Sequence, residues 1–346
     1  MPTFCRHNRF IERCPICSKT LPGNEPGAGG SAVRPRSGPR AGAARSERAR
    51  SRQREPALRV HREARSLDDG YRSELAPGLR ASADALRLAE EIAFAGGRLE
   101  VLAEQPPGLY GDARALARED LERATWTCFL IAYLCPLEDE EPFAGVRMAL
   151  AAAPDPLAGA TLELAGIPLG PRSSHEPSRG AETLRAYGEW TQRAAAAAGA
   201  AAAGAGPQAI AFGGDPVWSP ERRFERVFER LALPGFARSA RYEMLVTLGA
   251  LGLYEMRADS LHLTAGARGV AGEDPTTLAA KRVFGIGDPL LLERRAASLA
   301  QAAAVPIEAL DLALANWASP QPATLGVPRT SSDDDAFERA GAALGL

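Results

Sequence analysis

The chain has 346 residues, of which 45% are apolar, and carries a formal net charge of −2. This balanced charge gives no global sign of a nucleic-acid partner, so only a local basic patch can bind a phosphate backbone. No stretch reaches the roughly 18 consecutive apolar residues of a membrane span, and the N-terminus lacks the apolar core of a signal peptide, so we expect a cytoplasmic protein with no membrane segment.

Residues 1–21 predict a zinc knuckle. In CRHNRFIERCPIC, a C-x-H pair, Cys5 and His7, precedes a C-P-x-C turn that presents Cys14 and Cys17. Three thiolates and one imidazole complete a tetrahedron, and four protein ligands leave no coordination position for water, so the zinc is expected to be structural. Such a short segment has too little core to fold without the metal. The alternative is a redox-active or merely reactive cysteine pair.

Residues 22–56 are rich in Arg, Gly and Pro and contain almost no core-forming side chains. They cannot bury enough apolar surface to offset the entropy lost on ordering, so we expect a disordered linker. Its arginines can engage phosphate. A solvated tether whose composition follows that of the genome explains them equally well.

Residues 57–320 predict a helical domain. A helix is expected near 82–95, and the run WTCFLIAYLC within 113–135 predicts a core helix that is apolar nearly all round. Cys128 and Cys135 are about 10 Å apart along that helix, whereas a disulfide needs Cα atoms within about 7 Å. We therefore expect two unpaired core cysteines.

The next segments alternate between loops and helices. Residues 151–181 are loop-rich, and the low-complexity stretch 191–208 predicts a helix end that runs into a flexible insertion. Ser219, followed by proline, predicts the start of an amphipathic helix, and 237–252 predicts another. The acidic segment 321–346 is expected to be a partly disordered tail.

The stretch TTLAAKRVFGIGDPLLLERRA has the pattern of a helix-hairpin-helix unit. Asp274 and the proline after it predict a helix to residue 283, FGIG predicts a turn, and Asp288 with its proline predicts a second helix. A third helix is expected to begin at Pro306. The alternative is an ordinary helix connection with small residues in a tight turn.

This hairpin predicts sequence-independent binding to the DNA backbone. Glycines allow backbone N–H groups to approach a phosphate, and the next helix N-terminus adds a positive dipole end. Asp288 argues against this interpretation, because its carboxylate can cap those N–H groups and repel a phosphate. The residues expected to bind DNA are Lys281, Arg282, Gly285, Ile286, Gly287, Arg294 and Arg295.

Asp311 follows the predicted hairpin in the sequence. In helix-hairpin-helix DNA glycosylases, a helix after the hairpin leads to an aspartate that faces the flipped nucleotide, and Asp311 in VPIEALDLALANW resembles it in position. A carboxylate there can deprotonate a nucleophile or stabilise positive charge. The alternative places Asp311 on the exposed face of a terminal helix.

Three segments resemble the alpha-glutamyl/putrescinyl thymine pyrophosphorylase family. They are TWTCFLIAYLCPLEDEEPF at 125–143, RLALPGFARSARYEMLVTLG at 230–249 and TTLAAKRVFGIGD at 276–288. The resemblance implies a mainly α, glycosylase-like domain that replaces the pyrophosphate of a modified 5-hydroxymethyluracil in DNA with an amine. It also implies base flipping, arginines that bind pyrophosphate, and Asp311 as the catalytic base.

Three hypotheses about function follow. A DNA-modifying enzyme, with DNA and an amine as substrates, requires a carboxylate and basic groups that converge on a pocket beside the hairpin. A non-catalytic DNA-binding protein requires only a continuous basic face. A zinc-containing adaptor, whose knuckle binds a protein partner, requires an exposed apolar patch.

Overall fold

The computed structural model describes residues 66–156, 162–199, 204–266, 274–329 and 334–346. The predicted zinc ligands Cys5, His7, Cys14 and Cys17 and the expected linker lie outside these ranges, as do the first residues of the predicted helical domain. The described residues all belong to one compact unit that extends to the C-terminus.

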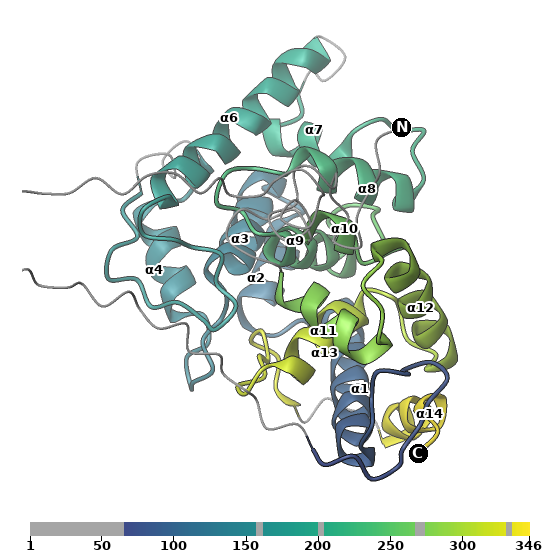
Figure 1. The fold of residues 1–346 in the computed structure, drawn as a ribbon. Coiled ribbons are helices and arrows are strands. Elements are labelled where there is room, and N and C mark those ends of the chain that lie inside the picture. Colours follow the sequence, from purple (N-terminus) through teal and green to yellow (C-terminus); the bar gives the residue numbers. More distant parts are fainter. Residues whose placement is uncertain (1–65, 157–161, 200–203, 267–273, 330–333) are drawn as a thin grey trace, which may run out of the picture. The chain divides into compact units, whose positions relative to one another are not determined.

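The described part of the chain is mainly helical, which confirms the predicted fold class, and it contains no strand (Figure 1). None of its helices combines the length and apolarity needed to cross a membrane. The helices are α1 (Ser82–Glu104), α2 (Gly108–Leu116), α3 (Leu121–Leu134), α4 (Ala144–Ala152), α6 (Gly180–Ala198), α7 (Pro207–Gly213), α8 (Pro220–Arg230), α9 (Arg238–Ala250), α10 (Leu263–Gly266), α11 (Pro275–Phe284), α12 (Pro289–Ala302), α13 (Ala309–Ala318) and α14 (Asp334–Leu344).

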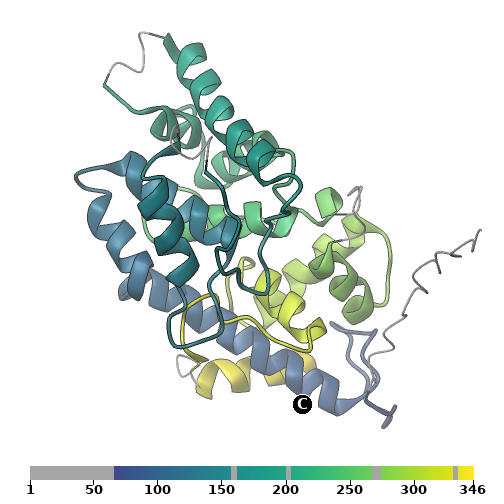
Figure 2. The same cartoon turned by 90° about the vertical axis from the view of Figure 1, so that its left-hand side faces the viewer.

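The C-terminal segment differs from the partly disordered tail that its composition predicted. Its helix α14 packs along α1, as does α13 (Figures 1 and 2). Ala336, Ala340 and Leu344 recur at four-residue spacing and are buried, so α14 has a narrow apolar stripe. The Tyr71 hydroxyl also donates to the carbonyl of Leu344. Beyond Pro320, the described residues therefore belong to the helical unit.

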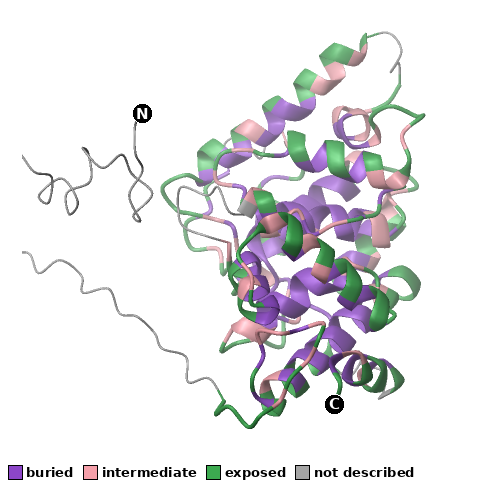
Figure 3. Ribbon diagram, turned by 45° about the vertical axis from the view of Figure 1, so that its right-hand side comes forward, coloured by how far each residue is buried: buried purple, intermediate pink, exposed green. Residues whose placement is uncertain are grey.

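The WTCFLIAYLC run forms the buried helix that its composition predicted. Every residue of α3 from Ala124 to its end is buried, and Figure 3 shows the buried residues gathered in the interior of the described part. The single helix expected over 113–135 is instead divided into α2 and α3, because Asp120 caps α3 by accepting from the Arg123 N–H at 2.9 Å. Cys128 and Cys135 are buried free thiols, as expected.

The helix starts predicted after Ser219 and Asp274 are confirmed, whereas the helix expected to begin at Pro306 begins at Ala309. The Ser219 hydroxyl accepts from the Arg222 N–H at 3.2 Å and caps α8. Asp274 caps α11 by accepting from the Thr277 N–H at 3.1 Å, with proline at the first helical position. Both caps satisfy N–H groups that a helix leaves without intrahelical partners. The second of these helices leads into the predicted hairpin.

Candidate functional site

Helix α11, a short turn and helix α12 follow one another in the order that the sequence predicts. Helix α11 ends at Gly285, whose φ of 66° lies in the left-handed region that glycine adopts without a steric penalty. Helix α12 then begins after Asp288. Ile286 and Gly287 form the turn between the two cap residues, Gly285 and Asp288.

Gly285 faces another part of the protein. Its N–H donates to the Lys281 carbonyl at 2.9 Å, and the Gly78 N–H donates to the Val283 carbonyl at 2.8 Å. A Cβ on Gly78 would lie 1.9 Å from the Arg282 carbonyl oxygen, so only glycine permits this approach. The N–H of Gly285 and the end of α11 are thus used within the protein, through a contact that sequence analysis did not identify.

The other glycine of the hairpin is open. No atom lies within 4 Å of the position of a Cβ on Gly287, and neither Ile286 nor Gly287 donates its N–H to a described residue. The Asp288 carboxylate accepts from the N–H groups of Leu290 at 2.9 Å and Leu291 at 3.1 Å. As anticipated, Asp288 therefore occupies the N-terminus of α12. Among the described residues, no acceptor is found for the backbone N–H groups at the tip of this turn.

The predicted cations lie on both sides of this tip. Arg282 at the end of α11 and Arg294 on α12 are exposed, whereas Lys281 and Arg295 are half-buried. The Arg295 guanidinium donates to the Glu74 carbonyl at 2.8 Å. The hairpin therefore combines an open backbone with a cationic rim, in which Arg295 is partly committed to the protein itself.

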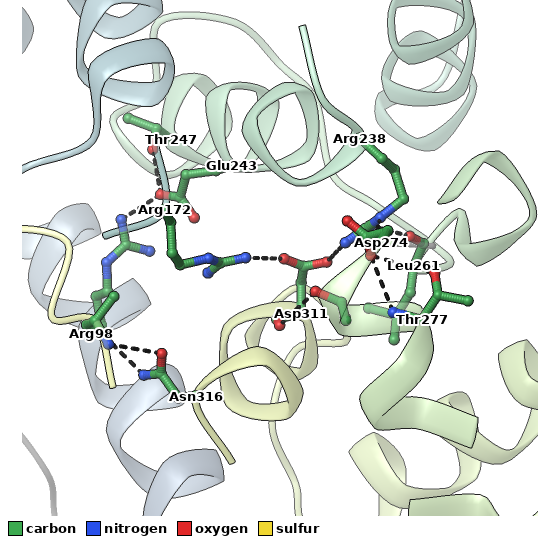
Figure 4. Close-up of polar contacts among 12 residues, drawn as sticks. Arg98, Arg172, Arg238, Glu243, Thr247, Leu261, Asp274, Thr277, Asp311 and Asn316 are labelled. Carbon is green, nitrogen blue, oxygen red and sulfur yellow. Dashed lines mark hydrogen bonds and ion pairs between the residues drawn. The ribbon is translucent and has the colours of Figure 1, made fainter. Parts of the chain in front are cut away.

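Asp311 is buried near the start of α13, with 3% of its surface exposed. The alternative that placed it on an exposed helix face is wrong. Its Oδ1 lies 3.1 Å from Arg172 Nη2, and its Oδ2 accepts from Arg238 Nη2. Figure 4 shows the carboxylate between the two guanidinium groups. Each carboxylate oxygen is thus held by one arginine.

Arg238 connects this aspartate to the hairpin. Its Nε lies 3.0 Å from Asp274 Oδ2, at the N-terminus of α11, and its Nη1 donates to the Leu261 carbonyl at 2.8 Å. Burial disfavours the charged guanidinium, but Asp311 and Asp274 outweigh that effect and raise the pKa of Arg238. Arg238 therefore stays charged and ties α11 to α13.

Arg172 reaches Asp311 from a loop that caps α3. The Gly170 N–H lies 3.1 Å from the carbonyls of Leu134 and Cys135, and the Ser174 N–H donates to the Tyr133 carbonyl at 2.9 Å. These bonds satisfy carbonyls that the end of a helix leaves unpaired. The loop lies in the region expected to be loop-rich, but no local pattern marks Arg172 as the partner of Asp311.

A small cavity adjoins Arg172. Its volume is about 10 Å³, which is room for about one water molecule. Arg172 Nη1 is buried and has no hydrogen-bond partner in the described part of the chain. Across the cavity, one oxygen of Glu243 binds Arg98 at 2.5 Å and Thr247 at 3.1 Å. The residues that line the cavity include Cys135, Arg172, Ser239 and Glu243.

The titratable groups around the cavity limit its chemistry. Burial raises the pKa of the Cys135 thiol to about 12, so this cysteine is protonated near neutral pH and is a poor nucleophile. Cys135 also has a φ of 61°, an uncommon conformation for a residue with a side chain. Within the described ranges, no three His, Cys, Asp or Glu side chains gather as a metal site requires.

A half-buried histidine packs on the same aromatic ring as Arg241. His262 stacks on Phe228 with ring centroids 4.4 Å apart, and the Arg241 guanidinium carbon lies 4.5 Å from the centroid of the same ring. Burial lowers the pKa of His262 to about 4, so the imidazole is neutral near pH 7. Its Nε2 has no hydrogen-bond partner among the residues that the structure describes.

Comparison of the chain with known proteins found no match. No protein-family model matches the chain, and neither a curated protein nor a solved structure is similar to it. The function must therefore be argued from the hairpin surface, defined by Lys281, Arg282, Ile286, Gly287, Arg294 and Arg295, and from the ion-pair cluster, defined by Arg172, Arg238, Asp274 and Asp311.

Proposed function

We propose that this protein is a DNA-modifying enzyme acting on a thymine-derived base, built as a glycosylase-like helical domain with a helix-hairpin-helix unit. It replaces the pyrophosphate of a 5-hydroxymethyluracil pyrophosphate in DNA with an amine. The observation that carries this proposal is the buried carboxylate of Asp311 between Arg172 and Arg238, one of which is ion-paired to the first helix of the hairpin.

The hairpin surface supports DNA as the partner. Gly287 is open and the turn has free N–H groups, so a phosphate oxygen can approach its backbone closely. Arg282 and Arg294 are exposed beside it and supply salt-dependent contacts to the phosphates. Contacts of this kind position an enzyme along a duplex without selecting a base sequence.

Arg172 is the side chain best placed to receive the departing pyrophosphate. One of its terminal nitrogens binds Asp311 and the other has no partner, and guanidinium groups bind phosphate oxygens in a bidentate manner. When Arg172 turns to the pyrophosphate, it releases Oδ1 of Asp311. The water-sized cavity admits a base only after the Arg172 loop has withdrawn.

The proposed reaction exchanges one bond for another. The C–O bond between the methylene carbon and the pyrophosphate breaks, and pyrophosphate leaves with the bonding electrons. The amine nitrogen forms a bond to the same carbon, and its proton passes to Oδ1 of Asp311. Asp311 thus acts as the general base once Arg172 has moved, while Arg238 keeps the carboxylate in place.

A transfer assay tests this proposal. The full chain is incubated with duplex DNA containing pyrophosphorylated 5-hydroxymethyluracil and either glutamate or putrescine, followed by digestion and mass analysis of the nucleosides. We expect an amine-bearing nucleoside and free pyrophosphate, with both lost in Asp311→Asn and Arg172→Gln.

The matched control is Glu91→Gln. Glu91 is as buried as Asp311, at 3% exposure, but it pairs with Arg329, so its loss affects stability without removing a proposed catalytic group. Equal activity in Asp311→Asn and the parent protein would contradict the role of Asp311. No product with any amine would contradict the enzymatic proposal.

A non-catalytic DNA-binding protein is the second candidate. Two observations favour it: both oxygens of Asp311 are already ion-paired, and the adjoining cavity is far smaller than a nucleobase. It predicts salt-dependent binding to thymine and 5-hydroxymethyluracil duplexes alike, with no product. Fluorescence anisotropy across a salt series, run beside the transfer assay, separates the two candidates.

The proposal includes a structural zinc ion at Cys5, His7, Cys14 and Cys17, which are residues of the types and spacing that bind zinc. The zinc segment is a docking element for DNA or for a protein partner. Metal analysis of the full chain should give one zinc per molecule, and Cys14→Ser should lose it. Retention of zinc in that variant would contradict the ligand assignment.

A further inference from the structure

Three large apolar side chains on the two helices of the hairpin are exposed. Leu278 on α11 is 40% exposed, and Leu290 and Leu291 at the start of α12 are 69% and 46% exposed. Single exposed leucines are normal on protein surfaces, whereas a group of them indicates an interaction site. Leu290 and Leu291 directly follow the open turn at Gly287.

The two leucines of α12 are not needed for the core. The buried face of this helix is formed by Leu292, Ala296 and Leu299, each fully buried. Leu290 and Leu291 lie off this stripe. Asp288 accepts from the N–H groups of both leucines, so the first turn of the helix is fixed while their side chains face solvent.

The surroundings of the leucines favour DNA as the partner. Leu290 and Arg294 are four residues apart, so they share one face of α12, and Arg282 is exposed at the other side of the turn. Two carboxylates at the start of α12 accept from backbone groups: Asp288 caps its own helix, and Glu293 accepts from the N–H groups of Leu261 at 2.8 Å and Leu263 at 2.6 Å. The apolar pair therefore has a cationic rim, complementary to the phosphates on either side of a base step.

We propose that Leu290 and Leu291 form an apolar wedge that inserts between base steps of duplex DNA while the hairpin surface holds the backbone. Apolar wedges unstack base steps in this way in other DNA-binding proteins, and an enzyme that acts on a base must first take it out of the stack. The inference rests on the proposed function, since it takes DNA as the partner, and it names the element that opens the duplex.

Base unstacking is measured directly in solution. The full chain is titrated into duplex DNA in which 2-aminopurine lies next to a thymine or a 5-hydroxymethyluracil, and its fluorescence rises when stacking is lost. Anisotropy of a labelled duplex gives the affinity in parallel. The variant is Leu290→Ala with Leu291→Ala, and the control is Leu86→Ala on α1, whose leucine is 44% exposed.

We expect the parent protein and the Leu86 control to raise the fluorescence, and the double variant to lose most of that rise. Its affinity should fall by less than about tenfold, because the cationic contacts supply most of the binding. Equal fluorescence in the double variant and the parent protein, with binding intact, would overturn the wedge and leave the DNA-binding proposal standing.

Two other outcomes overturn the wedge for different reasons. If the parent protein does not bind duplex DNA at low salt, the proposed function fails and the wedge fails with it. If light scattering shows a parent dimer that the double variant converts to monomers, the leucines are a self-association surface. Circular dichroism and thermal unfolding of the double variant show that it is folded, so a loss of signal cannot arise from unfolding.

Discussion

The hairpin surface and the ion-pair cluster meet at α11, and they are built in opposite ways. The first comes from one continuous stretch of sequence and faces solvent. The second joins Arg172, Arg238 and Asp274 to Asp311, with Arg172 and Asp311 139 positions apart in the sequence, and it is buried. A surface that binds a large polyanion can be formed by one short stretch of sequence. A buried charge, in contrast, needs oppositely charged partners, and here these come from several elements.

The two regions should therefore respond differently to mutation. Exposed charges contribute about 0 to 1 kcal/mol each to stability, whereas removing one member of a buried pair costs about 3–5 kcal/mol because its partner is left uncompensated. Substitutions in the cluster should affect folding, and substitutions on the hairpin surface should affect DNA binding. The variants below test this division.

Asp311→Ala should have the largest effect. It leaves Arg172 and Arg238 without a carboxylate between them, so we expect the free energy of unfolding to fall by about 3–5 kcal/mol. Chemical denaturation followed by circular dichroism measures this. A loss below about 1 kcal/mol, the size typical of a surface pair, would contradict a tightly coupled buried cluster.

Stability should also depend on pH through His262. Burial lowers its pKa from 6.5 to about 4 in the folded protein, so between these values the unfolded chain binds the proton more readily. Stability is therefore fully present above pH 6.5 and falls as the pH drops to 4, by about 3 kcal/mol in all.

The variant His262→Asn isolates this contribution. Asparagine tolerates the left-handed backbone at this position, where φ is 52°, and it does not titrate. The difference in unfolding free energy between the parent protein and the variant should therefore change across that pH window. A difference that stays constant from pH 7 to 4 would show that His262 keeps an ordinary pKa.

Two glycine-to-alanine substitutions should distinguish the packed side of the hairpin from its open side by their effects on stability. Gly78→Ala places a Cβ against the Arg282 carbonyl, so the backbone must move, and we expect a loss of about 1–3 kcal/mol. Gly287→Ala meets no neighbouring atom and should leave stability within about 0.5 kcal/mol. Thermal unfolding of both variants tests the contrast, and equal effects would mean that the hairpin does not pack on Gly78.

Asp288→Ala should lower stability only modestly and should tighten DNA binding. The cap is worth about 1 kcal/mol, and its removal frees the N–H groups of Leu290 and Leu291. It also removes a negative charge from the hairpin surface. Anisotropy should show a lower dissociation constant with a steeper salt dependence. Weaker binding would mean that the cap orders the DNA-binding conformation.

Local signals in the sequence predicted much of the secondary structure. Ser219, Asp274 and Asp288 cap the helices that they were expected to cap, because a cap depends only on residues a few positions away. The apolar run in α3 likewise predicted burial. Asp120 carries a similar local signal, and it caps α3 at the point where the helix expected over 113–135 is divided.

What the sequence by itself determined is the helical class, the helix starts around the hairpin and the position of Asp311 near the start of a helix. Tertiary structure decided that Asp311 is buried between two arginines, that Gly78 packs on the hairpin and that α14 packs on α1. The physical reason is the distance along the sequence over which each interaction acts. Caps and apolar stripes depend on neighbours within a turn or two of helix, whereas ion pairs and close packing depend on which distant segments meet.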